Sequence, residues 1–372
     1  MSGNHFRFRA GQLFCACDSD GLPLDVGLVP DQATTLRLAL SFALAVLAQT
    51  LTVSVLPLLS VSLAPDPAQR AWPYLGLLAG GALATFPASF LLDLFGRRAA
   101  FALGASLGLA GGVLAFWSVW HAAFGPFLLG VVWLGMAQGF GLFYRHAGAV
   151  SAHGASGTIF SAGLLAAVIA PLLSETLAIH APADAQALVL LLAGFVYLLA
   201  LALAVMLPAH VRAVDLPDDL TQRPPLFVLV MASVTAALAW ALMSGVMAHA
   251  PLLMAGCGIG LGGSVFMMSA HLMAMYAPGF VIGRAIARWG GARVGMAGVV
   301  MLLGAVWLLP QLASAAPMGL TLVVAGMGWG LATIGATAWL HASGRPSALM
   351  LACHDLMLFL GAMAGVWTLA FV

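Results

Sequence analysis

The chain has 372 residues, of which 63% are hydrophobic and only 7% are charged. A soluble globular domain is usually about 45–50% apolar and about 25% charged, so this composition excludes a water-soluble protein. The formal net charge is +1, which provides no bulk basic field for nucleic acid. The composition therefore predicts a polytopic membrane protein whose main surrounding is the lipid bilayer and which has no nucleic-acid partner.

The N-terminal segment, residues 1–35, is polar and lacks the basic-then-apolar order of a signal peptide. We interpret it as a cytoplasmic extension. Cys15 and Cys17 lie in this extension, and the sequence assigns them no role.

Eleven apolar runs follow, each long enough to cross a bilayer core about 30 Å thick, which needs roughly 20 helical residues. They cover residues 36–63, 72–92, 99–120, 124–144, 156–177, 185–207, 226–248, 264–286, 294–312, 318–340 and 348–371. A polar linker, residues 208–225, divides six spans from five. The sequence thus predicts an all-α fold with an N-terminal half at 36–207 and a C-terminal half at 226–372.

The arginines predict the orientation of these spans. With the N-terminus in the cytoplasm, every arginine except Arg70 falls at a cytoplasmic end, as the positive-inside rule requires. Tyr144, Arg145 and His146 end the fourth predicted span, and we expect them to anchor it at the cytoplasmic interface.

The turn after the second span has a counterpart in the other half. In the same frame, the residues are Ser89, Asp93, Gly96, Arg97 and Arg98 in the first half and Gly283, Ala287, Arg288, Gly290 and Arg293 in the second. The first copy resembles the G-x-x-x-D-x-x-G-R-R loop of major facilitator transporters, with Ser89 where Gly is usual. The second copy has Ala287 in place of the Asp.

This resemblance implies a major facilitator fold of two pseudo-symmetric halves, which normally has 12 spans, with substrate near the midplane. It also implies that the loop is a conformational latch, although a plain charged turn is the alternative. The expected latch residues are Asp93, Gly96, Arg97, Arg98 and Arg288.

Soft side chains gather on the seventh and eighth predicted spans. Met243 and Met247 are four residues apart, as are His271 and Met275, so each pair shares one helix face. At about 1.5 Å per residue, both pairs lie roughly 8–10 Å below the periplasmic boundary. Thioether and imidazole ligands suit Cu(I), so these four side chains are predicted to bind one copper ion. Packing is the alternative, because Met often fills irregular gaps.

The M-x-x-x-M followed by H-x-x-x-M on this frame is similar to the CcoA-type bacterial copper importers. That resemblance implies a secondary-active importer in the bacterial inner membrane, with copper as the transported ion and no permanently bound cofactor. It further implies a supply of copper for cytochrome oxidase assembly, with a cytoplasmic copper chaperone as a partner. Cys257 is the expected counterpart of a functional cysteine in that family.

Other soft or ionisable residues are weaker candidates. The accessory metal or redox set is Met254, Cys257, Met267, Met268, Met350, Cys353, His354 and Asp355. Asp355 is the one acid well inside a predicted C-terminal span. It is interpreted as an exit-side ligand, a proton carrier or, preferably, a polar clamp between helices.

Two other functions remain open. One is a carrier of a small organic solute or drug, with the Met cluster serving as packing. The other is a membrane copper sensor or assembly factor, although repeated halves favour a carrier. The sequence contains no phosphate-binding G-x-x-x-x-G-K-[ST] loop, so we expect no enzyme activity.

Overall fold

The computed structural model describes residues 32–149, 155–208 and 222–369, and these contain helices but no strand. The N-terminal half consists of α1 (Gln32–Leu63), α2 (Trp72–Trp120), α3 (Phe124–Ala149), α4 (Ala155–Ser161), α5 (Leu164–His180) and α6 (Ala185–Val205). The C-terminal half consists of α7 (Leu226–Gly256), α8 (Leu261–Tyr276), α9 (Gly279–Trp289), α10 (Gly291–Leu308), α11 (Ala315–Ala342) and α12 (Ala348–Leu369). Short 3-10 turns lie at Pro67–Gln69 and Leu309–Gln311.

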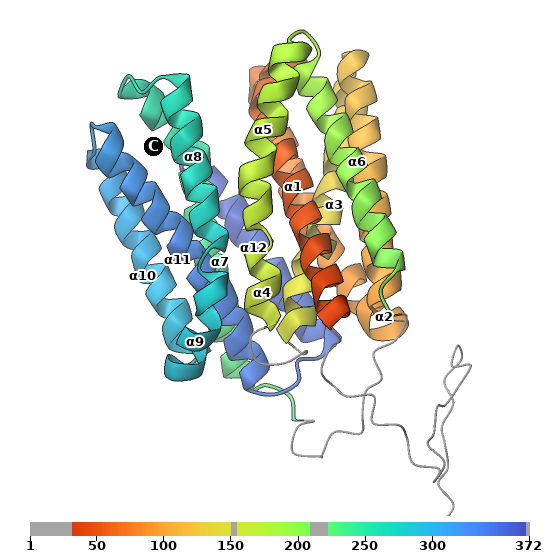
Figure 1. Cartoon of the computed structure of the whole chain (residues 1–372), viewed down its shortest axis with the longest axis vertical. Helices are drawn as coiled ribbons and strands as arrows, with labels where there is room; N and C mark the ends of the chain where they lie inside the picture. The colour runs from red at the N-terminus through yellow and green to blue at the C-terminus, as the bar shows by residue number, and fades with distance from the viewer. Residues whose placement is uncertain (1–31, 150–154, 209–221, 370–372) are drawn as a thin grey trace, which may run out of the picture.

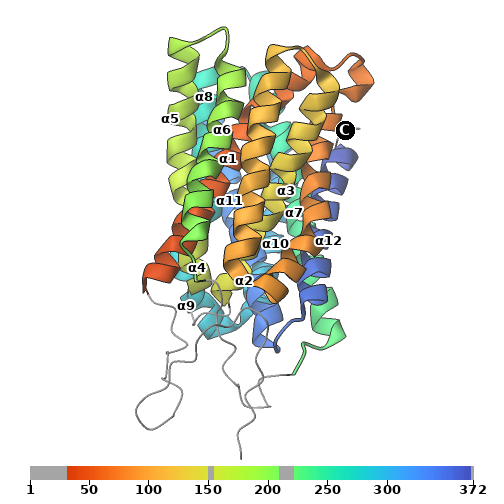
Figure 2. The ribbon, with the colours of Figure 1, turned by 90° about the vertical axis from the view of Figure 1, so that its right-hand side faces the viewer.

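Within the described residues, nine helical segments are long and apolar enough to cross a membrane, and the bent pair α8–α9 adds a tenth. Helix α2 has 49 residues, about 73 Å at 1.5 Å per residue, which is more than twice a bilayer core. Non-helical backbone at Gly96 divides it, and Figure 2 shows its two parts side by side. Eleven spans result, so the predicted all-α membrane fold is confirmed.

The two halves lie side by side in Figure 1, with α8–α11 on the left, α1, α2, α3 and α6 on the right, and α12 behind the middle of the bundle. They contact each other through α2 and α12, α5 and α8, and α4 and α9. We call the end where α6 ends and α7 begins the linker end. Large apolar side chains such as Phe266 and Trp307, which are 73% and 71% exposed, point outward as a bilayer requires.

The chain reverses direction at one glycine in each half. Gly96 has φ 81° and ψ 179°, and Gly290 has φ 81° and ψ 152°. Backbone in this region is essentially restricted to glycine, because a Cβ is strained there. The two glycines occupy equivalent positions in the sequences of the two halves. Because they also share a backbone conformation, the internal repeat is visible in the structure as well.

We predict that Gly290→Ala destabilises the protein by about 1–3 kcal/mol, the usual strain of such backbone in other residues. A Cβ at Gly290 would meet nothing within 4 Å, so the effect isolates the backbone. Gly304→Ala is the matched control, because a Cβ there also meets nothing within 4 Å and the site is helical. Thermal unfolding in detergent should show a lower Tm for Gly290→Ala only; equal Tm values for the two variants would contradict the assignment.

Candidate functional site

The end of α3 lies inside the molecule, so the expectation that Tyr144, Arg145 and His146 anchor a span at the membrane interface is wrong. The helix continues to Ala149, five residues beyond the predicted end of the span. Arg145 is 1% exposed and His146 is 3% exposed. They are buried because the C-terminal half places polar partners opposite them.

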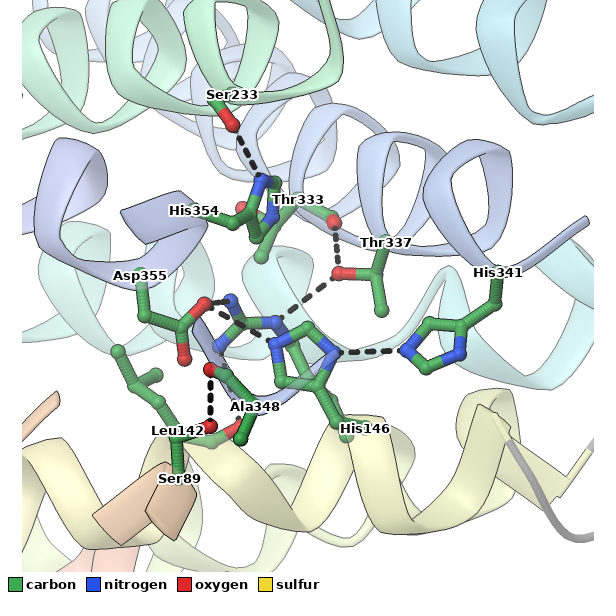
Figure 3. Close-up of polar contacts among 11 residues, drawn as sticks. Ser89, Leu142, His146, Ser233, Thr333, Thr337, His341, Ala348, His354 and Asp355 are labelled. Carbon is green, nitrogen blue, oxygen red and sulfur yellow. Dashed lines mark hydrogen bonds and ion pairs between the residues drawn. The ribbon is translucent and has the colours of Figure 1, made fainter. Parts of the chain in front are cut away.

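The main partner is Asp355 on α12, which is completely buried. Arg145 donates from Nη2 to Asp355 Oδ1, and its Nε donates to Thr337 Oγ1 on α11 at 3.0 Å. A third guanidinium nitrogen, Nη1, donates to the Leu142 carbonyl at 3.1 Å. One arginine of the N-terminal half therefore binds two helices of the other half (Figure 3).

Histidines extend this contact. His146 Nε2 lies 3.1 Å from Asp355 Oδ1, and His146 Nδ1 lies 3.0 Å from His341 Nε2 on α11 (Figure 3). His354 Nδ1 lies 3.0 Å from Ser233 Oγ on α7. We call the residues Arg145, His146, Thr337, His341 and Asp355 the linker-end clamp.

The clamp lies near the linker end of the bundle. Arg145 is four residues before the end of α3 and Asp355 is seven after the start of α12, which places them about 6 and 11 Å inside. Ser89 adds a contact at the same end, because its Oγ donates to the Ala348 carbonyl on α12 at 2.5 Å. Ser89 is the residue that replaces the glycine usual in the major facilitator loop.

A second feature is a continuous row of aromatic rings across the two halves, which we call the aromatic layer. Its members are Phe42, Tyr144, Phe160, Tyr276, Trp329, Trp240 and Phe359. Phe160 of the N-terminal half lies 5.7 Å from Trp329 of the C-terminal half between ring centroids. Trp329 in turn lies 5.6 Å from Trp240, and such spacings are typical of favourable aromatic pairs.

Tyr144 is next to Arg145 of the clamp, and most of the other rings of the aromatic layer lie deeper in the bundle. Counted from the linker end of their helices, Phe42, Phe359 and Trp240 are 10, 11 and 14 residues inside, or about 15–21 Å. This depth is close to the middle of the helices, where the two halves of a carrier form its substrate site.

Three buried polar atoms at or beyond this depth have no hydrogen-bond partner: Gln138 Oε1, Trp240 Nε1 and His271 Nε2. His271 Nδ1 lies 2.6 Å from the Leu322 carbonyl; since a carbonyl only accepts, Nδ1 carries the hydrogen. Neutral His271 then presents an unshared electron pair at Nε2. Buried polar atoms usually have partners, so these three are candidates for contact with a bound molecule.

The predicted copper ligands come from helices that lie on either side of α11. That helix packs against both α7 and α8, which touch each other little. Met243, His271 and Met275 are buried and Met247 is half-buried. Met243 lies about 20 Å from the end of α7, and His271 lies about 15 Å from the start of α8. Both helix ends are on the side away from the linker end. These depths exceed the expected 8–10 Å because α7 and α8 extend past their predicted limits. The metal set stays a prediction.

The accessory candidates are scattered. Met254 and Met267 are buried, Met268, Met350 and Cys353 are half-buried, and exposed Cys257 donates from Sγ to the Leu312 carbonyl at 3.7 Å. His354 and Asp355 contact protein groups at the clamp, and we assign neither to a metal. Across the described residues no three His, Cys, Asp or Glu side chains are arranged to share a metal ion. Cys15 and Cys17 lie outside those residues.

The expected latch residues differ in their exposure and in their described contacts. Arg97 Nη2 donates to the Ala147 carbonyl at the end of α3 at 3.0 Å. Asp93 and Arg98 are exposed, and the Arg288 guanidinium lies 5.8 Å from the centroid of the Trp289 ring. The latch stays a prediction, whereas the clamp already joins the halves in this structure.

Sequence reasoning preferred a polar clamp between helices for Asp355, and the structure agrees; it missed the partners on α3 and the aromatic layer. The one available signal for the clamp was the pair of Arg145 and Asp355, since opposite charges near membrane depth usually face one another. No sequence spacing links the seven rings, which come from seven different helices.

Eleven spans, a repeated chain reversal and polar contacts between two halves define a membrane transporter built from two similar halves. The chain belongs to the Major Facilitator Superfamily, which residues 38–366 match. Members of this family are transporters and not enzymes.

Relatives agree with this assignment. The riboflavin transporter RfnT of Brucella anthropi is 30% identical over 314 residues, covering 81% of this chain and 78% of the relative. The human organic anion transporter MFSD10 superposes with a TM-score of 0.71 at 18% identity, over 91% of this chain and 93% of that one. The proton:xylose symporter XylE, bound to 6-bromo-6-deoxy-D-glucose, gives 0.72 at 14% identity, over 91% and 88%. The names of these three proteins refer to organic solutes.

We predict that Arg145→Gln and Asp355→Asn each destabilise the protein by about 3–5 kcal/mol, because each leaves its buried partner without a counter-charge. The double variant should recover most of this loss. Unfolding free energies measured in detergent give the coupling through a double-mutant cycle. Arg98→Gln, at an exposed arginine of the same end, should change stability little. Additive losses in the double variant would show that the two charges are not coupled.

Proposed function

We propose that this chain is a secondary carrier of a small planar aromatic solute with the size and polarity of a flavin. The proposal takes up the organic-solute alternative of the sequence analysis in place of copper import. It is supported by the riboflavin transporter relative, which aligns with most of this chain. The observation that carries it is the aromatic layer, which brings rings from both halves together near mid-depth.

The chemistry of the layer suits such a molecule. Aromatic side chains bind planar rings by stacking, worth about 1–3 kcal/mol for a nucleic-acid base. Trp240 Nε1 can donate, Gln138 Oε1 can accept, and His271 Nε2 can accept from a ring N–H. Flavins combine a flat ring system with N–H, carbonyl and hydroxyl groups, and so match both kinds of contact.

The distribution of the arginines indicates the orientation of the carrier in its membrane. We place the carrier in a bacterial inner membrane with its linker end in the cytoplasm, because the arginines favour that side. The bilayer and the solute are then its partners.

Trp329→Leu should weaken riboflavin binding about tenfold, since the loss of one stacking ring corresponds to about 1.4 kcal/mol. Trp329→Phe should retain most of the affinity. Quenching of riboflavin fluorescence on titration with protein in lipid nanodiscs measures the Kd. Trp307→Leu, at an outward-facing tryptophan, is the matched control and should bind as wild type. Wild-type protein that neither binds nor transports riboflavin would remove the flavin proposal.

Copper import is the second candidate, and one observation favours it. A histidine that ligates a metal usually donates its other ring N–H to a carbonyl or carboxylate, as His271 does to Leu322. In this alternative Met243, Met247, His271 and Met275 are the ligands, and a cytoplasmic copper chaperone receives the ion.

Met243→Leu separates the two candidates, because leucine keeps the apolar volume but removes the sulfur. Under the flavin proposal, the variant takes up riboflavin as well as wild type, and radioactive copper uptake in cells stays at the vector level for both. Copper uptake by wild type that Met243→Leu abolishes would establish the copper alternative. Western blotting of the wild type and of Met243→Leu controls for expression.

A further inference from the structure

Buried polar atoms without a hydrogen-bond partner continue from the aromatic layer toward the linker end. Among them are Gln138 Oε1 on α3, Thr333 Oγ1 on α11 and His354 Nε2 on α12. Their residues are 5%, 1% and 0% exposed. Buried polar groups are normally hydrogen-bonded, and leaving one unpaired is costly. These three atoms therefore indicate a polar partner that comes from outside the chain.

Thr333 is an exception on its own helix. A helical threonine commonly bonds its hydroxyl to a carbonyl one turn earlier. On α11, Thr321 donates to the Pro317 carbonyl at 2.8 Å, and Thr337 donates to the Thr333 carbonyl at 2.9 Å. Thr333 Oγ1 makes no such bond, although Thr333 is as deeply buried as Thr337. Its hydroxyl is thus available to a molecule bound between the helices.

Helical spacing connects these atoms to the clamp and to the rings. Trp329, Thr333 and Thr337 follow one another at intervals of four on α11, so they lie along one stripe of that helix. On α3, Gln138 precedes Arg145 by seven residues and therefore lies two turns deeper on the same face, the one that contacts the C-terminal half. A polar path consequently leads from the rings to the clamp.

The length of this path is that of a short carbon chain. His354, Thr333 and Gln138 lie about 9, 13 and 16 Å from the linker end of their helices. The rings of Phe359 and Trp240 begin at about 16 Å and continue to about 21 Å. An extended chain of five carbons spans about 5 Å, at about 1.5 Å per bond. Such a chain fits on the linker side of the rings.

Hydroxyl groups match the chemistry of all three atoms. Gln138 Oε1 accepts, whereas the Thr333 hydroxyl donates and accepts. His354 Nδ1 lies 3.0 Å from Ser233 Oγ (Figure 3), and its Nε2 is a donor in one tautomer and an acceptor in the other. Because a hydroxyl both donates and accepts, a chain of hydroxyls satisfies these atoms with either tautomer.

We infer that Gln138, Thr333 and His354 form a polyol subsite, which binds a neutral hydroxylated chain attached to the planar ring of the solute. The inference rests on the proposed function, with the ring in the aromatic layer and the chain toward the linker end. On the linker side, Arg145 is already paired with Asp355, so a phosphate there would add a second anion to one guanidinium. The subsite therefore selects riboflavin over its phosphate ester and over flavins without the hydroxylated chain.

Three flavins separate the contribution of the chain from that of the ring. Lumiflavin has a methyl group in place of the hydroxylated chain of riboflavin, and flavin mononucleotide has a phosphate at its end. Fluorescence quenching in lipid nanodiscs gives each Kd for the wild type. Riboflavin should bind at least about tenfold more tightly than lumiflavin, which leaves the buried polar atoms unpaired, and more tightly than flavin mononucleotide. Equal affinities for riboflavin and lumiflavin would overturn the subsite and leave the proposed function standing, whereas a wild type that binds none of the three removes both.

Thr333→Val keeps the shape of the side chain and removes its hydroxyl. The variant should weaken riboflavin binding about three- to tenfold, the usual effect of one hydrogen bond, and leave lumiflavin binding unchanged. Thr321→Val is the matched control, because Thr321 is a buried threonine of the same helix whose hydroxyl bonds within that helix; it should bind both flavins as wild type.

Gln138→Leu should give the same pattern as Thr333→Val, and it decides the test if Thr333→Val does not fold. Unchanged lumiflavin binding in either variant shows that the ring site is intact. If the ratio of riboflavin to lumiflavin affinity in the folded variants equals that of the wild type, water alone occupies the subsite and the inference is overturned.

Discussion

The structure depends on one electrostatic constraint, the burial of Arg145 and Asp355 against each other between the two halves. Charges in a low-dielectric interior are tolerated only as partners, so the closed linker end is stable while the pair is intact. Thr337 accepts a further hydrogen bond from Arg145, and His146 lies against Asp355, so both members of the pair have additional polar contacts.

The clamp joins the two halves by polar contacts, and the aromatic layer joins them by contacts between rings. Arg145 and Asp355 lie about 6–11 Å from the linker end, and Phe42, Phe359 and Trp240 lie further in at about 15–21 Å. A solute held among the rings would be separated from the linker side by the clamp. The rings come from helices of both halves, so a flat molecule bound among them would contact both halves at once.

Much of the fold follows from the sequence, because the bilayer imposes a length on every apolar run. The eleven spans and the turns at Gly96 and Gly290 were predictable from run length and repeated glycine. The site was less predictable. Arg145 follows an apolar run and reads as a helix end, and only its partner on α12, 210 residues away, shows that it is interior. Met243 and His271 satisfied a local spacing rule, but spacing does not reveal that α11 lies against both of their helices or which molecule their groups contact.

At Gly96 and at Gly290 a single residue turns the chain, so no loop separates the two spans that meet there. A long loop would let neighbouring spans slide independently, whereas a one-glycine turn transmits displacement of one span directly to the next. We therefore expect residues 72–95 and 97–120 of α2 to move together, and α9 to move together with α10. A displacement of one of these spans is then passed to the span that follows it.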